Sequence, residues 1–421
     1  MIPEHTLSLD EIDLSQIEFW ELPWSEREGA FQTLRQERPI AFFEEPAIAA
    51  GDFELPAGPG YYALTKHRDV AEASRHPEVF LSGPGATSIM DLPPEFVEYF
   101  NGMISTDSPK HARLRRIVSN AFNPRRVKSI EDSIESLARD MVDNAAASGT
   151  GDFINDIAAP FPLRIICDMM GLPPSEDQTV LNCSNIILSG GDPDVIPEGD
   201  DVIAALLGAG ETLTGLMQEL GKYRVDNPID DITSALVNAE IEEEKLTHQE
   251  LASFFILLVT AGNETTRTAI AHALNLFTEN PDQKQILIED YDGNAKTGID
   301  EIVRYASPVI WMRRTLATDY TLSGKDLKAG DKVILYYSSA NRDEDVFDNP
   351  FDFDVRRTPN DHFGFGAPGP HFCLGAHLAR REITVMFREL LSRYPNVHAT
   401  TPPAMLRSNF VNGIKRLGYS L

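Results

Sequence analysis

The chain has 421 residues, of which 42% are hydrophobic, and its 65 acidic and 37 basic side chains give a formal net charge of −28 at pH 7. Such an acidic excess argues against nucleic acid as a partner. Three cysteines provide no disulfide framework, and no apolar run near the start or elsewhere reaches the ~20 residues of a membrane span, so we expect a cytoplasmic protein without a membrane anchor.

The predicted elements follow one another without a flexible linker, a repeat or a low-complexity tract. We therefore expect one mainly α-helical domain over residues 1–421, with a small β-rich part at about 40–65 and 310–340. The elements away from the motifs are helices at Glu28–Glu37, Val127–Ala147 and Asp201–Asp226, and strands at Tyr61–Leu64 and Lys332–Ser339.

The longest predicted helix begins at the capping box Thr247-His-Gln-Glu250 and ends before Pro281. It is apolar on nearly all sides, which is typical of a buried helix. The motif Ala261-Gly-Asn-Glu-Thr-Thr266 in its middle is costly for stability alone. It is either a kink with a solvated polar stripe, or a functional site in which Thr265 bonds to the carbonyl four residues earlier and locally opens the helix.

Glu301 and Arg304 lie one helical turn apart, before the helix-ending Pro308. A pair at this spacing is usually a surface ion pair worth a few tenths of a kcal/mol. The meandering segment that follows contains a third partner, Arg357. We expect the two arginines to flank the carboxylate and hold the meander in place, which is a structural role.

Cys373 follows the Gly/Pro-rich stretch that starts at Phe365 and directly precedes a helix predicted at Leu374–Tyr394. The start of a helix favours negative charge, so we expect this thiol to ionise easily and to suit an axial ligand of haem iron, with His371 as a polar neighbour. The alternatives are a buried structural cysteine, a zinc site with His371 and His377, and a nucleophile. The zinc site lacks a second cysteine, and nothing orients a base for a nucleophile.

Four features in this order along the chain resemble the cytochrome P-450 family of haem-thiolate monooxygenases: Ala261–Thr266, Glu301 with Arg304, Asn341-Arg-Asp343, and the Cys373 loop. The resemblance covers nearly the whole chain. It implies a mainly α fold with a small β-rich part, in which haem b (iron protoporphyrin IX) lies between the long central helix and the helix after the cysteine.

The resemblance also implies roles for single residues. Cys373 would be the metal ligand, and Glu264 and Thr265 would relay protons to dioxygen, for which Ala261 and Gly262 leave room. Further haem contacts by position are His111, Arg115, Arg314, His371, Ala261, Phe365 and Gly375, with the first four at the propionates and Arg313 as the alternative to Arg314.

Phe365 lies eight residues before Cys373, one more than in most bacterial members of the family. This longer loop resembles mycobacterial members that hydroxylate terminal methyl carbons of methyl-branched lipids and sterol side chains. Four further stretches are similar to that group: Phe19–Leu22, Cys167–Pro173, Ala252–Val259 and Phe410–Lys415. We expect omega-hydroxylation of a lipid, terpenoid or sterol side chain, with another hydrophobic substrate such as a polyketide or terpene as the alternative.

Apolar side chains expected on the distal side of the haem would form a channel for such a substrate. Each of them could equally be part of the ordinary core. They are Ile89, Met90, Phe96, Met103, Leu257, Val309, Ile310, Trp311, Met312 and Phe410.

The resemblance implies ferredoxin and ferredoxin reductase as electron donors. Residues 110–128 contain seven basic side chains and no carboxylate, and Arg380 and Arg381 follow Cys373 closely. This basic surface suggests a docking face for an acidic ferredoxin, unless part of it holds propionates and the rest is solvated. A peroxide-driven haem enzyme usually lacks the acid–alcohol pair, and a non-catalytic haem sensor or carrier does not need one.

Overall fold

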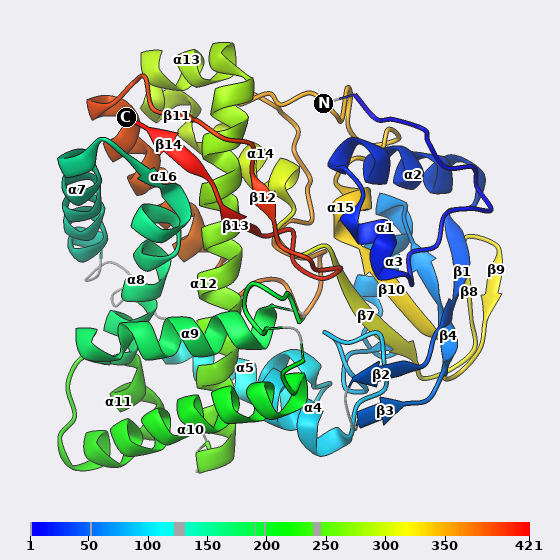
Figure 1. Ribbon diagram of the computed structural model, residues 1–421. Helices are drawn as coiled ribbons and strands as arrows, with labels where there is room; N and C mark the ends of the chain where they lie inside the picture. The colour runs from blue at the N-terminus through cyan, green and yellow to red at the C-terminus, as the bar shows by residue number, and fades with distance from the viewer. Residues whose placement is uncertain (1, 51–52, 122–130, 190, 198, 239–245) are drawn as a thin grey trace.

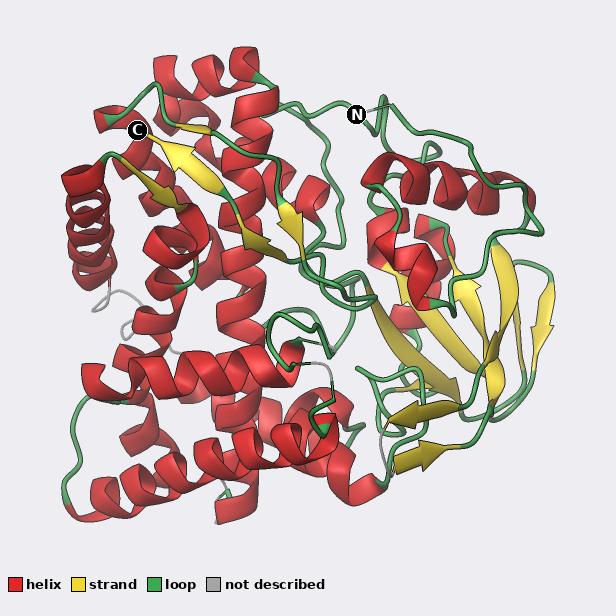
Figure 2. Ribbon diagram, viewed as in Figure 1, coloured by secondary structure: helices red, strands yellow, loops and turns green. Residues whose placement is uncertain are grey.

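The computed structural model describes residues 2–50, 53–121, 131–189, 191–197, 199–238 and 246–421. Most helices gather on one side of the molecule, and the main sheet lies on the other side with α1, α2, α3 and α15 (Figures 1 and 2). The predicted mainly α fold with a small β-rich part is therefore confirmed.

The helices of the described residues are, in chain order, α1 (Ile17–Glu21), α2 (Trp24–Glu37), α3 (His67–Arg75), α4 (Pro94–Asn101), η1 (Gly102–Ser105), α5 (Lys110–Ala121), α7 (Glu131–Ser148), η2 (Ile154–Ala158), α8 (Pro160–Met170), η3 (Pro174–Glu176), α9 (Asp177–Leu188), α10 (Val202–Asp226), α11 (Ile232–Val237), α12 (His248–Glu279), α13 (Pro281–Glu289), α14 (Tyr291–Ala306), α15 (Tyr337–Ala340) and α16 (Ala376–Arg393). The strands are β1 (Ile40–Glu45), β2 (Ile48–Ala50), β3 (Phe53–Leu55), β4 (Gly58–Leu64), β5 (Phe80–Leu81), β6 (Thr150–Asp152), β7 (Trp311–Leu316), β8 (Tyr320–Leu322), β9 (Lys325–Leu327), β10 (Lys332–Tyr336), β11 (His398–Ala399), β12 (Ala404–Met405), β13 (Ile414–Arg416) and β14 (Gly418–Ser420). None of these helices is both long and apolar enough to cross a lipid bilayer.

The long helix α12 runs through the helical side of the molecule (Figure 1). Its 32 residues begin at the predicted capping box: the Thr247 hydroxyl accepts from the Glu250 N–H at 3.1 Å, and the Glu250 carboxylate accepts from the Thr247 N–H at 2.9 Å. It packs against α8, α9 and α10 as well as α14 and α16. The prediction of a buried central helix is confirmed.

The other predicted helices also appear. Helix α2 begins four residues earlier than predicted, at Trp24, and α10 begins after Asp201, whose carboxylate caps it. Helix α7 begins at Glu131 in the described residues, and residues 127–130 of its predicted start lie outside them. Helix α16 begins at Ala376, two residues later than predicted.

The main sheet has the strand order β1-β4-β10-β7-β5. Strand β10 is parallel to β4 and antiparallel to β7, with Tyr336 opposite Trp311 at the end of the ladder. Because β7 begins at Trp311, residues after Tyr336 have no partner strand there. The predicted strand Lys332–Ser339 is thus too long, since the chain turns at Tyr337 into the short helix α15.

Candidate active site

A cavity of about 1490 Å³, counting its part open to solvent, lies between α12, α16, β7 and the Cys373 loop. Its wall is mostly apolar. The predicted haem contacts all line this cavity: Cys373, His111, Arg115, Arg314, His371, Ala261, Phe365 and Gly375. The fold thus brings together residues that lie more than 260 positions apart in the sequence.

The Cys373 loop is held by its own backbone. The Cys373 N–H donates to the Phe365 carbonyl at 2.9 Å, and the Gly366 N–H donates to the Phe363 carbonyl at 2.8 Å. Gly369 passes so close to α3 that a Cβ atom there would lie 2.4 Å from the Ser74 carbonyl oxygen, so a larger residue would push the loop away. These contacts present the sulfur at the cavity wall, just before α16.

The thiol of Cys373 is not intrinsically acidic. Cys373 is only partly exposed, on the side of the cavity that it lines. Protein atoms enclose the rest, and this burial raises its pKa more than the Gly375 N–H, Arg115 and Arg380 lower it. The expectation of an easily ionised thiol from the helix start is therefore wrong for the side chain itself. Thiolate formation at this site is instead expected to accompany metal binding, which releases the proton.

A cationic cluster forms another part of the wall. The rings of His111 and His371 lie 4.1 Å apart between centroids, and Arg115 donates to the Phe372 carbonyl at 2.7 Å. Burial and the neighbouring arginines lower the pKa of both histidines. In the described part of the chain, neither Arg115 nor Arg314 pairs with a carboxylate. The site therefore fits a bound group that carries carboxylates and an iron atom to which the Cys373 sulfur can bind, as haem does.

Arg313 and Arg314 point to opposite faces of β7, as neighbours on a strand must. Arg314 lines the cavity. Arg313 instead donates to the carbonyls of Ser88, Ile89 and Met90 at 3.1–3.3 Å and to the Asp91 carboxylate at 2.6 Å. Of the two arginines, only Arg314 is therefore placed to meet a propionate.

Thr265 lines the cavity together with Ala261 and Gly262. Its hydroxyl donates to the Ala261 carbonyl at 2.6 Å, which is the predicted bond to the carbonyl four residues earlier. Helix α12 nevertheless stays α-helical through this turn, so the expected local opening of the helix is not observed.

Glu264 does not line the cavity, unlike Thr265. Neighbouring residues on an α-helix point about 100° apart, and Glu264 is buried against Arg267, with which it forms an ion pair. Arg267 also donates to the Asn185 side chain of α9 at 2.8 Å. Oε1 of Glu264 has no hydrogen-bond partner among the described residues. The acid and the alcohol are thus adjacent in sequence but face different surroundings.

The predicted substrate contacts divide into two groups. Met103, Leu257, Val309 and Met312 line the cavity. The remaining residues do not, because they pack elsewhere. Ile89, Ile310, Trp311 and Phe410 belong to the apolar cluster beside the sheet. The Phe96 ring is tilted against that of Phe100, with the ring centroids 4.6 Å apart, and the Met90 carbonyl accepts from Arg313.

Phe254 and Leu258 of α12 also line the cavity, as a helical period counted from Leu257 and Ala261 predicts. Two further polar residues of the wall, Thr266 on α12 and Glu382 on α16, were not predicted as site residues. Burial raises the pKa of Glu382 well above the usual range. No pattern in the sequence marked Glu382.

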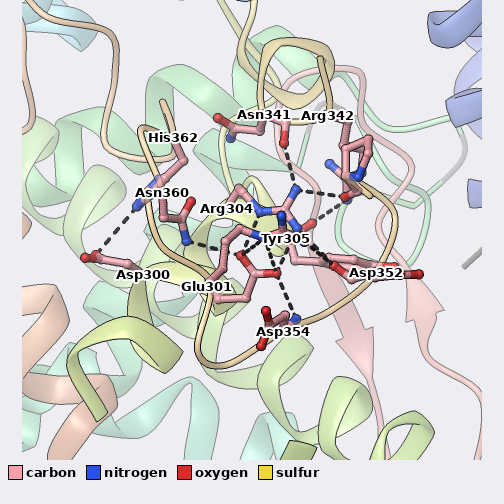
Figure 3. Close-up of polar contacts among 12 residues, drawn as sticks. Asp300, Glu301, Arg304, Tyr305, Asn341, Arg342, Asp352, Asp354, Asn360 and His362 are labelled. Carbon is pink, nitrogen blue, oxygen red and sulfur yellow. Dashed lines mark hydrogen bonds and ion pairs between the residues drawn. The ribbon is translucent and has the colours of Figure 1, made fainter. Parts of the chain in front are cut away.

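Behind the cavity, Glu301 is the centre of a buried ion-pair cluster (Figure 3). Its carboxylate accepts from Arg304 at 2.7 and 2.8 Å, from Arg357 at 3.1 Å and from Asn360 at 3.1 Å. Arg304 also donates to the carbonyls of Asn341 and Pro350. Glu301 and Arg304 are fully buried, so the pair is not an exposed surface ion pair.

Of the six described basic side chains on the predicted surface, four are ion-paired within the protein. Lys110 pairs with Glu98, Arg113 with Glu250, Arg380 with Asp300 and Arg381 with Glu135. Arg125, Arg126 and Lys128 lie outside the described residues. The net positive charge of this face is therefore smaller than the sequence suggests.

Comparison with known proteins identifies the family. The family model "Cytochrome P-450" matches residues 210–420. The chain is 48% identical to the methyl-branched lipid omega-hydroxylase of Mycobacterium tuberculosis, covering 99% of this chain and 96% of that protein, and 37% identical to the steroid C26-monooxygenase of Mycolicibacterium smegmatis, covering 91% and 87%.

A solved structure agrees with these matches. The Mycobacterium marinum cytochrome P-450 in complex with pseudoionone superimposes with a TM-score of 0.93 at 40% identity, covering 99% of this chain and all of that one. The predicted resemblance, fold and monooxygenase class are confirmed. The chain belongs to the cytochrome P-450 family.

Proposed function

We propose that this enzyme inserts one oxygen atom of O2 into a terminal C–H bond of a methyl-branched lipid or sterol side chain. The observation that carries the proposal is the apolar cavity that Cys373 lines together with Thr265, Leu257 and Ala261 of α12. Two relatives, named for omega-hydroxylation of methyl-branched lipids and for steroid C26 oxidation, support the substrate class.

In this proposal Cys373 binds the iron of haem b, and Arg115, Arg314, His111 and His371 hold its propionates. The bound haem supplies the activation of dioxygen and the oxidation of the C–H bond. Apolar residues such as Met103, Val309 and Met312 exclude water and orient the chain. Oxidation at a terminal carbon requires that the chain enters end-on.

Product analysis tests the substrate and the reaction together. The haem-loaded enzyme is incubated with ferredoxin, its reductase, a reduced nicotinamide and a methyl-branched fatty acid under isotopically labelled dioxygen. We expect one terminal alcohol that carries one labelled oxygen atom, and little product with peroxide alone. Products hydroxylated at internal carbons, or equal turnover with peroxide, would contradict the proposal.

We further propose that the Thr265 hydroxyl is the last proton donor before the cavity and that Glu264 supplies the proton to this hydroxyl. The Thr265 hydroxyl donates to the Ala261 carbonyl while its oxygen remains available on the cavity side of α12. Glu264 has to leave Arg267 before it can serve this hydroxyl, because its carboxylate is ion-paired to Arg267 and does not line the cavity.

Replacing Thr265 with alanine should uncouple electron use from product formation. Without the hydroxyl, protons are delivered in the wrong order, so product per reduced nicotinamide should fall about tenfold or more while peroxide accumulates. Thr260→Ala is a matched control, because Thr260 makes the same kind of bond, 2.7 Å to the Ile256 carbonyl, on the same helix but does not line the cavity. Full coupling in Thr265→Ala would refute the role.

Electron delivery by an acidic ferredoxin to the face around α5 and Cys373 is also a proposal. It is supported by the basic side chains there, although many are paired within the protein. Raising the ionic strength should slow electron transfer from ferredoxin by about tenfold, because screening weakens charge steering. Stopped-flow reduction measures this rate. Substrate binding, measured by the haem absorption shift, should be insensitive to salt, and a salt-independent electron transfer rate would exclude this docking mode.

A cytoplasmic location is proposed from the cysteines. Cys167, Cys183 and Cys373 are all free thiols, and the first two are buried in the helical core. Free thiols of this kind fit a reducing compartment. Fractionation of the native host, with the protein detected by an antibody, tests this location.

A further inference from the structure

The middle of α12 carries buried polar atoms to which no other described residue makes a hydrogen bond. They are both amide atoms of Asn263, Oε1 of Glu264, Nε of Arg267, Oγ1 of Thr268 and Nδ1 of His272. None of these five residues lines the cavity. A buried polar atom without a partner costs about 1–3 kcal/mol, and in protein interiors ordered water commonly provides the partner. This cluster on one helix therefore points to an internal hydrated site.

Three of these residues, Glu264, Thr268 and His272, recur every four positions, so they lie one helical turn above another. We call them the polar stripe. All three are at most 2% exposed. Thr260, one turn before Glu264, donates its hydroxyl hydrogen to the Ile256 carbonyl at 2.7 Å. Within the described chain the Thr268 hydroxyl makes no such bond, so it is available to a partner outside the helix.

The ring of His272 needs a hydrogen-bond donor. Its Nε2 lies 2.8 Å from the Asn412 carbonyl oxygen, which can only accept, so Nε2 carries the hydrogen of this bond. Burial lowers the pKa of His272 to about 4, so the ring is neutral and Nδ1 is left as an acceptor. No side chain of the described residues donates to it, whereas a water molecule can.

The C-terminal segment covers the polar stripe. Asn412 binds His272, and the next residue, Gly413, lies against Glu264, where a Cβ atom would come within 3.3 Å of Oε1. Glu264 is paired with Arg267 through Oε2, so Oε1 is left for a second partner. Side chains one helical turn apart have Cβ atoms about 5–6 Å from each other, a separation that a bridging water can span.

The polar stripe ends beside α2. The ring of the half-buried Trp24 lies 5.4 Å from that of His272 between centroids. Its indole N–H donates to Oε1 of Glu28 at 3.1 Å. The other oxygen of this carboxylate, 3.5 Å from Arg342, has no hydrogen bond in the part of the chain that the structure describes. Glu28 therefore continues the row of unpartnered groups from His272 towards the outer side of α2.

We infer that a chain of ordered waters lies along the polar stripe and carries protons from solvent near Glu28 to Glu264, which passes them to Thr265. Thr268 and His272 are positioning residues, because they hold the waters in line. This inference rests on the proposed function, in which Glu264 is the donor to Thr265. One proton enters the water chain for each proton that Thr265 releases into the cavity, so no group keeps a changed charge.

Removing the Thr268 hydroxyl tests the inference without turnover. Valine has nearly the shape of threonine, so Thr268→Val should fold, and thermal unfolding verifies this. High-resolution crystal structures of the haem-loaded enzyme and of the variant are compared. We expect the unmodified enzyme to show waters bonded to Oε1 of Glu264, Oγ1 of Thr268 and Nδ1 of His272. In the variant the water at position 268 should be lost.

The same variant should slow the reaction. We expect product formation to fall about tenfold and the ratio of rates in H2O and D2O to rise, because proton supply becomes limiting. Kd for a methyl-branched fatty acid, measured by the haem absorption shift, should stay the same, since the polar stripe does not line the cavity. Thr268→Ser keeps the hydroxyl and should keep the rate. Thr260→Val is the matched control one turn before Glu264, because the Thr260 hydroxyl is already bonded to the Ile256 carbonyl, and it should also keep the rate.

Two results would overturn the water chain. One is a crystal structure in which the atoms of the polar stripe bond only to protein atoms. The other is a Thr268→Val enzyme as fast as the unmodified one while Glu264→Gln is slow, because Glu264 would then receive its protons by another route. If the unmodified enzyme forms no terminal alcohol, the proposed function fails instead, and the crystallographic waters still decide whether the water chain exists.

Discussion

Replacing Cys373 with serine should abolish monooxygenation and leave a folded protein. The sulfur lies at the wall of the cavity that also holds the cationic cluster of Arg115 and Arg314. A serine hydroxyl is a hard and weakly acidic donor, so it cannot push electron density towards the iron as a thiolate does. The reduced protein treated with carbon monoxide should lose the absorption maximum of a thiolate-ligated haem, and product should fall below detection.

The other cysteines provide the controls for this variant. Cys167 and Cys183 are buried in the helical core, and neither lines the cavity. Cys183→Ala should therefore keep both the carbon monoxide spectrum and the activity. If Cys373→Ser kept the thiolate spectrum, a different residue would have to be the ligand, and the proposed function would fail with it.

Local signals explain why the frame of the site could be predicted from the sequence. The capping box at Thr247 and the stop at Pro281 define α12 within a few residues, and the glycines and prolines before Cys373 mark a fixed loop. Motifs of this kind depend on contacts close in sequence, so they can be recognised before any tertiary contact is known. The shared family pattern then indicated the remaining predicted haem contacts, and the fold places these residues around one cavity.

Features that depend on tertiary packing could not be predicted in the same way. The direction of Glu264 depends on Arg267 and on Asn185 of another helix. Trp311 and Phe410 are apolar and were expected to line the channel. Instead their rings pack against each other beside the sheet, with the ring centroids 5.0 Å apart. The pKa of Cys373 follows from how deeply the loop is enclosed, which outweighs the helix start. The same limit explains why Glu382 was missed.

Removing the Glu301 carboxylate should destabilise the protein strongly. In Glu301→Ala, Arg304 and Arg357 would remain buried without their shared anion, and breaking a buried pair in this way costs about 3–5 kcal/mol. The damage should extend to the haem site. The backbone carbonyl of Asn341 accepts a hydrogen bond from Arg304, and its side-chain oxygen accepts one from the Phe363 N–H at 2.6 Å. Asn341 therefore links the cluster to the start of the Cys373 loop.

The free energy of unfolding in urea and the fraction of haem retained measure this effect together. Asp292→Ala is the matched control on the same helix, because the Asp292–Arg388 pair is exposed and such pairs contribute at most about 1 kcal/mol. Glu301→Gln keeps the shape and some hydrogen bonds but not the charge, so its loss should fall between the two. If Glu301→Ala were no less stable than Asp292→Ala, the arginines must find other partners, and the cluster would not be what holds the meander behind the haem.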